Sequence, residues 1–275
     1  MTTTYRPADP IWCAGCGHFG VQAAIARGLQ ALELAPHDVI VLAGIGCSGT
    51  IQNNLGTYGY HALHGRVLPT AAGVRLANPD LTVIAAGGDG DGYAIGVGHL
   101  VHALNRDLPF LYVVMNNGIY GLTKGQDSPT KPHDGRPPLD AVDLALSIPA
   151  TGFIARGFAR WSDQLNRLIE QALRYTGDRR GFAFVEVLSP CVTYNDTYAE
   201  WEASLHDVDA DPNHDPTDRP AAHARSAVLR SRGSSPVGLI YHDQDRSATP
   251  AVEQSAPAAE ERRTAYRTLR DRYAV

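Results

Sequence analysis

Two cysteines stand close together near the start of the chain, in the stretch IWCAGCGH at residues 11–18. They are Cys13 and Cys16, and the sequence has two more cysteines, Cys47 and Cys191. Cysteine thiolates bind zinc and iron–sulfur clusters and also take part in redox exchange. The pattern therefore raises the question of what these cysteines bind and where the rest of the site lies.

Several kinds of cysteine site fit this pattern. Free cysteine is common in protein cores, so Cys47 or Cys191 taken alone could be a packing residue. A structural zinc site usually brings a second CxxC or a closely spaced histidine pair, and no second CxxC occurs here. A thioredoxin-type pair is disfavoured because this CxxC precedes the first predicted strand. An iron–sulfur cluster on four thiolates remains open beside these alternatives.

A second set of polar residues could hold a diphosphate and a divalent cation. Asp89 lies in the stretch GGDGDG at residues 87–92, and Asn117 follows the next predicted strand. A strand that runs through a glycine-rich turn into a helix offers backbone N–H groups to phosphate, and magnesium prefers oxygen ligands. Each motif alone could be only a turn or a cap. Together, at this separation, they are typical of thiamine diphosphate enzymes.

Short apolar segments alternate with helical patterns along the chain. Strands are predicted at 39–44, 81–87, 110–115 and 182–188, and helices at 21–32, 73–79, 94–106 and 163–175. This alternation predicts an α/β fold, a parallel sheet with helices on both faces. Ligands of such sheets bind where the carboxyl ends of the strands meet. The four predicted strands are followed by Cys47, Asp89, Asn117 and Cys191.

Length and composition narrow the class of protein. A chain of 275 residues with 44% apolar side chains can bury one sizeable core. We expect one domain over 1–205 and an extension over 206–275, whose charged helical pattern at 260–273 would wrap the domain or a partner. The sequence shows neither a signal-peptide pattern nor a long apolar run, so we expect no membrane contact and a cytoplasmic location. The net charge of −5 argues against a nucleic-acid partner.

Six sequence blocks occur in an order that resembles the beta subunit of 2-oxoacid:ferredoxin oxidoreductases, most of all the 2-oxoglutarate enzymes. The blocks are WCAGCGH, GIGCSG, HALHGR, GDGDGYAIG, NNGIYGLTKGQDSPT and SPCVTYN. The resemblance covers residues 10 to about 200 and weakens towards the C-terminus. It implies a thiamine diphosphate-binding fold in residues 1–205, with a 4Fe-4S cluster next to the cofactor.

The resemblance also implies roles for individual residues. The cluster ligands would be Cys13, Cys16, Cys47 and Cys191. Magnesium would be held by Asp89, Asn117 and the carbonyl of Ile119. Thiamine diphosphate would contact Ile45, Gly46, Cys47, Ser48, His64, Gly90, Asp91, Gly121 and Leu122. His64, which would otherwise be interpreted as an ordinary loop histidine, would face the cofactor and act in catalysis.

The activity implied by the resemblance is the reversible, coenzyme A-dependent oxidative decarboxylation of 2-oxoglutarate to succinyl-CoA and carbon dioxide. Electrons would leave singly through the cluster to ferredoxin. Pyruvate, or a broad range of 2-oxoacids, is the alternative substrate. Two other classes stay open: a zinc-binding module, which would leave the GDG and NN motifs without a role, and a cluster-free thiamine decarboxylase, which would make the cysteine pattern a coincidence.

The scarcity of glutamate predicts a partner. Thiamine enzymes use a glutamate from a second domain to activate the cofactor, and residues 1–169 contain a single glutamate, Glu33. Glu33 ends the first helical pattern, at the edge of the sheet opposite the motifs. We therefore expect an alpha subunit that supplies this acid, in a heterodimer or a dimer of heterodimers.

Lysine is even rarer than cysteine. Of the 24 Lys and Arg side chains only two are lysines, Lys124 and Lys131, both in the loop after the Asn pair. A flexible ammonium suits a small anion such as the distal carboxylate of the substrate or a coenzyme A phosphate. Lys124 is the candidate because it lies near Gly121 and Leu122, although it could be a surface charge, and Lys131 is expected to be solvated. His99 and His102 are expected to pack or cap.

Overall fold

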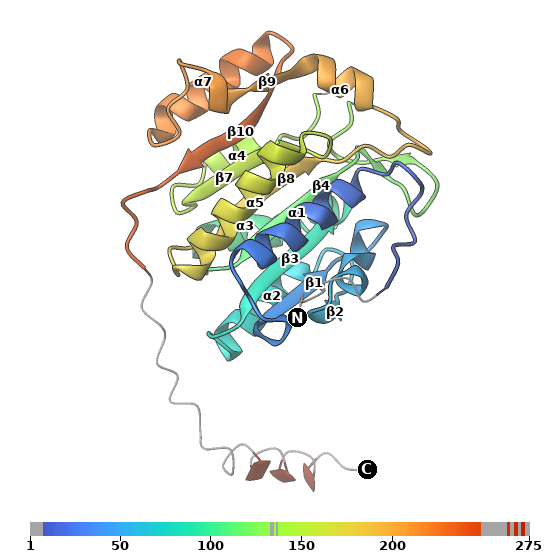
Figure 1. The fold of residues 1–275 in the computed structure, drawn as a ribbon, viewed down its shortest axis with the longest axis vertical. Helices are drawn as coiled ribbons and strands as arrows, with labels where there is room; N and C mark the ends of the chain where they lie inside the picture. Colours follow the sequence, from blue (N-terminus) through green and yellow to red (C-terminus); the bar gives the residue numbers. More distant parts are fainter. Residues whose placement is uncertain are drawn as a thin grey trace.

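The computed structural model describes residues 8–132, 135, 137–248, 263–264, 267–268 and 271–272. At its centre is an eight-stranded sheet in the order β2-β1-β3-β4-β8-β7-β10-β9 (Figure 1). Neighbouring strands are parallel except β7 and β10, which are antiparallel. The strands are β1 (Val39–Ala43), β2 (Tyr58–His61), β3 (Thr82–Gly88), β4 (Leu111–Asn116), β7 (Phe153–Phe158), β8 (Ala183–Leu188), β9 (Leu205–Asp207) and β10 (Ser235–His242), and a separate pair is formed by β5 (Ile119–Tyr120) and β6 (Gln126–Asp127).

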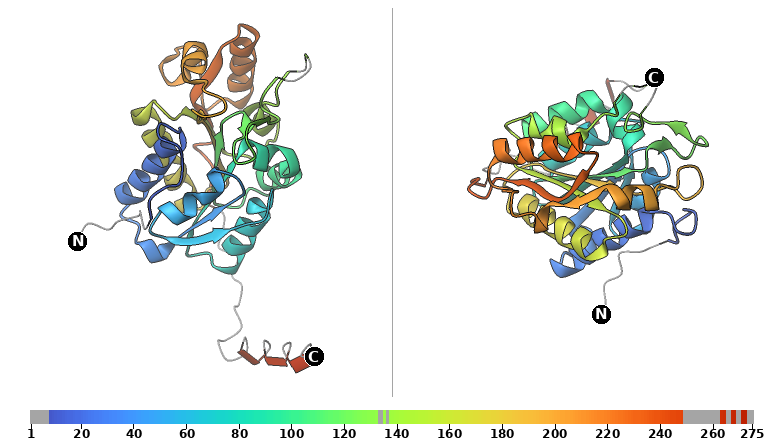
Figure 2. Two further views of the ribbon diagram at one scale, coloured as in Figure 1. Left: turned by 90° about the vertical axis from the view of Figure 1, so that its right-hand side faces the viewer. Right: turned by 90° about the horizontal axis from the view of Figure 1, so that it is seen from above.

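Helices cover both faces of the sheet, as the left view of Figure 2 shows. One face carries α1 (His18–Ala31) and α5 (Ser162–Gly177), and the other carries α2 (Val67–Ala77), α3 (Val97–Arg106), α4 (Ala141–Leu146) and α7 (Arg219–Ser231). The shorter elements are η1 (Pro36–Asp38), η2 (Ser48–Asn54), the π-helix η3 (Gly90–Ile95), α6 (Tyr198–Ser204) and η4 (Val208–Ala210). The predicted α/β fold is confirmed.

The two cores on either side of the sheet explain why its central strands are apolar throughout. In β4, Leu111, Val113 and Met115 pack towards α1 and α5, whereas Tyr112 and Val114 point to the opposite core. All five side chains are buried. Successive side chains of a strand alternate between faces, so a strand covered on both sides has to be apolar at every position.

The four predicted strands correspond to β1, β3, β4 and β8, and the other strands of the structure, β7 and β2 among them, were not predicted. β7 reads FIARGF, and Arg156 and Gly157 interrupt its apolar run. Arg156 is nevertheless buried, because its guanidinium bonds to Glu186 on the next strand. β2 is an exposed edge strand and lacks an apolar pattern. The helix predicted from residue 73 begins earlier, at Val67, since a proline is tolerated in its first turn.

The chain after residue 205 continues the same sheet. β9 pairs with β10, β10 pairs with β7, and α7 packs on the core that also contains α4. The boundary at residue 205 stays a prediction. Of the helix expected over 260–273, only residues 263–264, 267–268 and 271–272 are described, and they are helical. Within the described ranges, no helix has the length and apolar character needed to cross a membrane, and the cytoplasmic location stays a prediction.

Candidate active site

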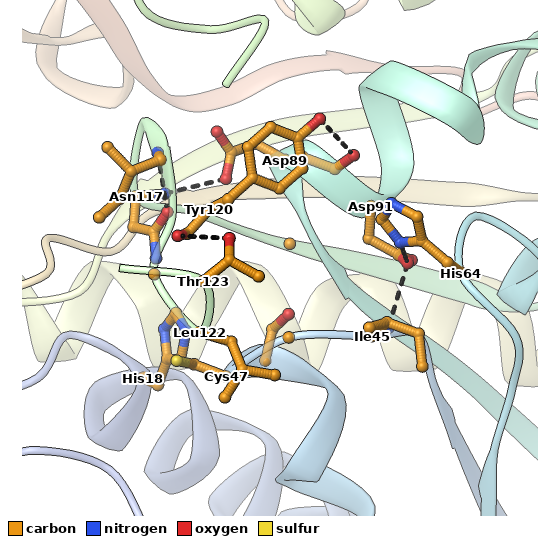
Figure 3. A pocket seen from close by; sticks show the side chains of 16 residues that line it. His18, Ile45, Cys47, His64, Asp89, Asp91, Asn117, Tyr120, Leu122 and Thr123 are labelled. Carbon is orange, nitrogen blue, oxygen red and sulfur yellow. Dashed lines mark hydrogen bonds and ion pairs between the residues drawn. The ribbon is translucent and has the colours of Figure 1, made fainter. Parts of the chain in front are cut away.

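A cavity of about 290 Å³ opens at the carboxyl ends of β1, β3 and β4 (Figure 3). β1 has β2 on one side and β3 on the other, and ligands of open parallel sheets bind at such a switch point. The cavity is lined by His18, Ile45, Gly46, Cys47, Ser48, His64, Gly88, Asp89, Gly90, Asp91, Asn117, Ile119, Tyr120, Gly121, Leu122 and Thr123. The structure thus brings together every residue expected to contact thiamine diphosphate or magnesium.

Asp89 is a buried carboxylate at the end of β3 and is held by three donors. The Asn117 backbone N–H donates to Oδ1 at 3.3 Å, and the Thr130 hydroxyl donates to Oδ2 at 2.6 Å. The Ser128 hydroxyl also donates to Oδ2. Burial raises the pKa of Asp89, and these hydrogen bonds oppose the shift. A cation next to Asp89 would stabilise the charged form that burial disfavours.

Two further oxygens accompany Asp89 after β4. The Asn117 side-chain oxygen accepts a hydrogen bond from the Ile119 N–H at 3.1 Å, across a turn in which Gly118 has a positive φ of 74°. One carboxylate, one amide oxygen and the Ile119 carbonyl suit magnesium. In the described part of the chain, no three His, Cys, Asp or Glu side chains form a metal site, so the fit rests on this mixed oxygen set.

Glycine opens the space for a phosphate group at the start of η3. A Cβ on Gly90 would lie 2.4 Å from the ring of Tyr120, so a larger residue would not fit there. Gly46, in the loop after β1, has a φ of 98°, which favours glycine. Backbone N–H groups at a helix start bind anions, and η3 begins here at the cavity. This cradle fits a diphosphate.

Asp91 lines the cavity and also holds the surrounding loops, while its expected contact with the diphosphate stays a prediction. Its Oδ1 accepts hydrogen bonds from the Ile45 N–H at 3.1 Å, the Gly65 N–H at 2.8 Å and His64 Nδ1 at 2.7 Å (Figure 3). Its Oδ2 is buried and has no hydrogen-bond partner among the described residues. The carboxylate therefore fixes the loops after β1 and β2 and orients His64. A contact between Asp91 and a diphosphate would have to come from its backbone.

The four cysteines approach one another from three separate segments. The Gly17 N–H donates to the Pro190 carbonyl at 3.1 Å, and Trp12 Nε1 donates to the Cys47 carbonyl at 2.7 Å. A Cβ on Gly17 would lie 2.7 Å from Ser189, so glycine at this position lets the CxxC turn dock against the loop after β8. These contacts bring Cys13 and Cys16 close to Cys47 and Cys191.

The electrostatics of the thiols support this convergence. Burial raises the pKa of Cys16 to about 11, and the charges of Cys191, Cys47 and Cys13 contribute. Burial, Cys191 and Cys13 also raise the pKa of Cys47. Thiolates that disfavour one another in a half-buried site need a cationic centre to be stable together. Thiolate sulfur is the usual ligand of iron–sulfur clusters, so the four cysteines fit such a cluster by their chemistry, and Cys47 also lines the cavity.

Sequence reasoning assigned no role to several residues of the site. His18 lines the cavity, is buried and lies with Nδ1 2.7 Å from the Ser189 hydroxyl, and burial lowers its pKa to about 4. Tyr120 and Thr123 also line the cavity, and Ser128 and Thr130 hold Asp89. All five stand in the blocks that carry the resemblance, but only tertiary contacts reveal what their side chains touch.

The two lysines differ in their surroundings. Lys124 is exposed and follows Thr123, the last lining residue of the loop, but does not itself line the cavity. Lys131 forms an ion pair with Asp127 at 2.8 Å. Its solvated state and the role of Lys124 stay predictions. Glu33 does not line the cavity, and no glutamate is among the lining residues within the described ranges.

His99 and His102 lie away from the site. They line a second cavity of about 190 Å³ between α2 and α3, and His99 Nε2 lies 2.6 Å from Arg66 Nη1. The cavity has an apolar wall that includes Leu68 and Phe110. His99 is half-buried and His102 is exposed, so the expected packing or capping role stays a prediction.

Family models match two parts of the sequence. Residues 44–187 match the thiamine pyrophosphate enzyme, C-terminal TPP binding domain. Residues 191–259 match the C-terminal part of the pyruvate ferredoxin oxidoreductase beta subunit. The first match spans the cavity from the loop after β1 to the end of β8.

Relatives and a solved structure match over longer stretches. The 2-oxoacid:ferredoxin oxidoreductase subunit beta of Saccharolobus solfataricus is 39% identical over 85% of this chain and 82% of its own length. The 2-oxoglutarate oxidoreductase subunit KorB of Mycobacterium tuberculosis is 40% identical over 67% of this chain and 51% of its own. A structure of 2-oxoglutarate:ferredoxin oxidoreductase from Magnetococcus marinus, with 2-oxoglutarate, coenzyme A and succinyl-CoA bound, superposes with a TM-score of 0.81 at 32% identity, over 98% of this chain and 89% of that one.

Proposed function

We propose that this chain, which belongs to the beta subunits of the 2-oxoacid:ferredoxin oxidoreductases, acts in the reversible, coenzyme A-dependent oxidative decarboxylation of 2-oxoglutarate. The products are succinyl-CoA, carbon dioxide and electrons for ferredoxin. The likeness to the Magnetococcus marinus enzyme and to KorB favours 2-oxoglutarate over pyruvate. The observation that carries the proposal is the juxtaposition of four converging cysteines and a cavity with an Asp89–Asn117 oxygen set.

The proposed ligands follow from these contacts. Asp89, Asn117 and the Ile119 carbonyl hold magnesium, and the glycine-lined start of η3 receives the diphosphate. Bound thiamine diphosphate supplies the carbanion chemistry by which a 2-oxoacid loses carbon dioxide. Cys13, Cys16, Cys47 and Cys191 hold a 4Fe-4S cluster, which supplies a one-electron acceptor. Cys47 is the proposed cluster ligand that also lines the cavity, so a cluster held there would lie beside the cofactor site.

His64 is the proposed proton-handling side chain of this chain. Its Nδ1 is bonded to the Asp91 carboxylate, which places the ring proton on that nitrogen and leaves Nε2 for a bound molecule. The tautomer follows from the acceptor, because a carboxylate oxygen accepts and does not donate. His64 can thus give or take a proton at Nε2 while Asp91 holds the ring still.

The site needs an alpha subunit to be complete. The cavity lining has two acids, Asp89 and Asp91, and both are engaged by hydrogen bonds from this chain. Three exposed apolar side chains belong to the segments that line the cavity: Leu63 precedes His64, Ile95 ends η3, and Leu122 itself lines the cavity. We call these three residues the mouth patch. An exposed apolar patch of this kind marks an interaction site, and the alpha subunit would bring the activating glutamate there.

The test is an anaerobic preparation of the complex with its alpha subunit. We expect brown protein, about four irons per beta chain, bound thiamine diphosphate, and ferredoxin reduction that requires both 2-oxoglutarate and coenzyme A. Faster turnover of pyruvate would instead support the alternative substrate. Stoichiometric zinc without iron would support a zinc-binding module, and decarboxylation by iron-free protein would support a cluster-free decarboxylase. Either of the last two results would overturn the proposal.

A further inference from the structure

We propose that Ser128 and Thr130 position Asp89 for the magnesium ion, and that this pair of hydroxyls sets the metal affinity of the site. We call the two side chains the hydroxyl clamp. The inference rests on the proposed function, because it takes Asp89 as a magnesium ligand. Neither residue lines the cavity, so the clamp acts through Asp89 and not on a bound molecule.

Both hydroxyls reach the same oxygen of Asp89. Ser128 and Thr130 donate to Oδ2, the latter at 2.6 Å. From the described part of the chain, Oδ1 accepts one hydrogen bond, the longer contact of 3.3 Å from the Asn117 N–H. A carboxylate oxygen has two lone pairs, so Oδ1 keeps a lone pair for a cation while Oδ2 is saturated. The clamp therefore predicts that the ion binds Asp89 through Oδ1.

The Thr130 hydroxyl has one proton and three candidate acceptors. Asp89 Oδ2 lies at 2.6 Å, Asn116 Oδ1 at 2.9 Å and the Ser128 hydroxyl at 3.0 Å. Hydrogen bonds to a charged acceptor are shorter and stronger than those to a neutral one. The proton therefore goes to Asp89, and Thr130 is a charge-assisted donor.

Asn116 cannot take over as a donor to Thr130, because its amide orientation is fixed. Its Nδ2 donates to the buried Glu186 at 3.1 Å, and its Oδ1 accepts from the Gly118 N–H at 3.1 Å. A flipped amide would point its oxygen at the Glu186 carboxylate. Asn116 Oδ1 therefore stays a neutral acceptor next to Thr130, and the charge of Asp89 decides the direction of the threonine proton.

The clamp also ties the cofactor loop to the metal site at both ends. Ile119, whose carbonyl is a proposed magnesium ligand, begins β5, and the paired strand β6 leads to Ser128. The Ser128 N–H donates to the Gly118 carbonyl at 3.2 Å, which closes this loop next to Asn117. Residues one step behind a metal ligand fix its orientation, and their loss costs about 10- to 100-fold in metal affinity.

The experiment measures metal binding in the complex with the alpha subunit, after removal of cation and cofactor. Manganese replaces magnesium, and its bound fraction is followed by electron paramagnetic resonance at saturating thiamine diphosphate. We expect Thr130→Val to weaken manganese binding about tenfold, Thr130→Ser to bind close to the wild type, and Asp89→Asn to abolish binding. Thr70→Val is the matched control, since that half-buried hydroxyl donates to a helix carbonyl in α2.

The possible results distinguish a failure of the hydroxyl-clamp proposal from a failure of the proposed magnesium site. If Asp89→Asn binds manganese as tightly as the wild type, the proposed magnesium site is wrong. If Asp89→Asn fails but Thr130→Val matches the wild type, the clamp is wrong and the site stands. Equal losses in Thr130→Val and Thr130→Ser would also overturn it, because the hydroxyl would then not be the cause. Should Thr130→Val not fold, Ser128→Ala tests the other hydroxyl on the same oxygen.

Discussion

Lys124 holds a backbone conformation that lysine rarely adopts, with a φ of 75°. A residue with a Cβ in the left-handed region costs roughly 1–2 kcal/mol relative to the right-handed one, and glycine is the usual choice there. The next residue, Gly125, also has a positive φ. A strained backbone at an exposed lysine suggests that its ammonium group has a function. This agrees with the proposed contact between Lys124 and a substrate carboxylate or a coenzyme A phosphate.

Replacing Lys124 by asparagine should separate charge from strain. Asparagine tolerates the left-handed region, so we expect Lys124→Asn to fold as the wild type and to raise KM for 2-oxoglutarate about tenfold, or about 1.4 kcal/mol. Steady-state kinetics of the complex with 2-oxoglutarate, pyruvate and coenzyme A as varied substrates check this. A rise in KM for coenzyme A alone would assign Lys124 to that molecule, and unchanged constants would remove it from the site.

β7 carries a buried ion network through the sheet. Arg156 Nε donates to Glu186 Oε2 at 2.6 Å, and Arg156 Nη2 donates to Asp140 Oδ1 at 2.8 Å. Burial would lower the pKa of Arg156, but Asp140 and Glu186 raise it. The same Glu186 also accepts from Tyr93 and Asn116, so β7 and β8 are joined by charge as well as by the backbone.

Removing the arginine should therefore be costly. Arg156→Leu leaves the buried Glu186 carboxylate without its cation, whereas Asp140 keeps its ion pair with Arg230. Breaking a buried pair costs about 3–5 kcal/mol. We expect a clearly lower urea midpoint of unfolding. Adding Glu186→Gln should recover part of the loss, because the amide needs no counter-charge. Equal midpoints for wild type and Arg156→Leu would show that the network adds no stability.

The carboxyl group of Asp107, at the C-terminal end of α3, has a shifted pKa. Asp107 caps this helix, accepts from the Phe182 N–H at 2.9 Å and pairs with Arg246 at 2.6 Å. Burial raises its pKa to about 6 even though both partners lower it. The folded state thus keeps a proton that the unfolded state, with a pKa near 3.9, releases.

Because the pKa of Asp107 is higher in the folded state than in the unfolded state, a rise in pH lowers the free energy of unfolding. Stability falls as pH rises from about 4 to about 6, by up to about 3 kcal/mol from this group, and is flat above that window. Asp107→Asn cannot titrate and tolerates the positive φ of this position. Urea unfolding at pH 5 and pH 7 should show a larger drop for the wild type than for Asp107→Asn. The same drop in both proteins would contradict the raised pKa.

In the whole molecule, the cavity lies near one edge of the sheet, on a surface that the proposed alpha subunit would cover. The cavity opens at the β1–β3–β4 end of the sheet, beside the exposed edge strand β2. The side chains of the mouth patch, Leu63, Ile95 and Leu122, are exposed, and Leu122 lines the cavity. β10 and α7 lie towards the opposite edge of the sheet, so the two edges can be tested separately for contact with the alpha subunit.

A charge in the mouth patch should weaken subunit association. Leu63 is 77% exposed in the isolated chain, so Leu63→Asp should not disturb the fold. We expect the Kd for the alpha subunit, measured by isothermal titration calorimetry, to rise at least tenfold, or about 1.4 kcal/mol. Val228→Asp on α7, also at an exposed position, is the control and should bind normally. Similar affinities for both variants would place the interface elsewhere.

The fold class, and the kind of chemistry at the edge of the sheet, could be predicted from the amino-acid sequence alone. Strands buried on both faces must be apolar throughout, so β1, β3, β4 and β8 could be predicted from local composition. The polar motifs that follow each strand had to share an edge, because parallel strands end on the same side. The shared edge thus located the site, whereas the individual contacts between Ile45 and Leu122 were implied by the family resemblance, and Tyr120 was missed.

The folded structure was needed to tell the side chains that would contact a ligand from those that hold other side chains in place. Asp89 and Asp91 look alike in GDGD, yet one faces the hydroxyl clamp and the other fixes His64. β7 was hidden because Arg156 is buried by partners far away in the sequence. The hydrophobic pattern of the sequence indicates only whether a position is buried. These roles depend on contacts between segments that are distant in the sequence, and such contacts form only when the chain folds.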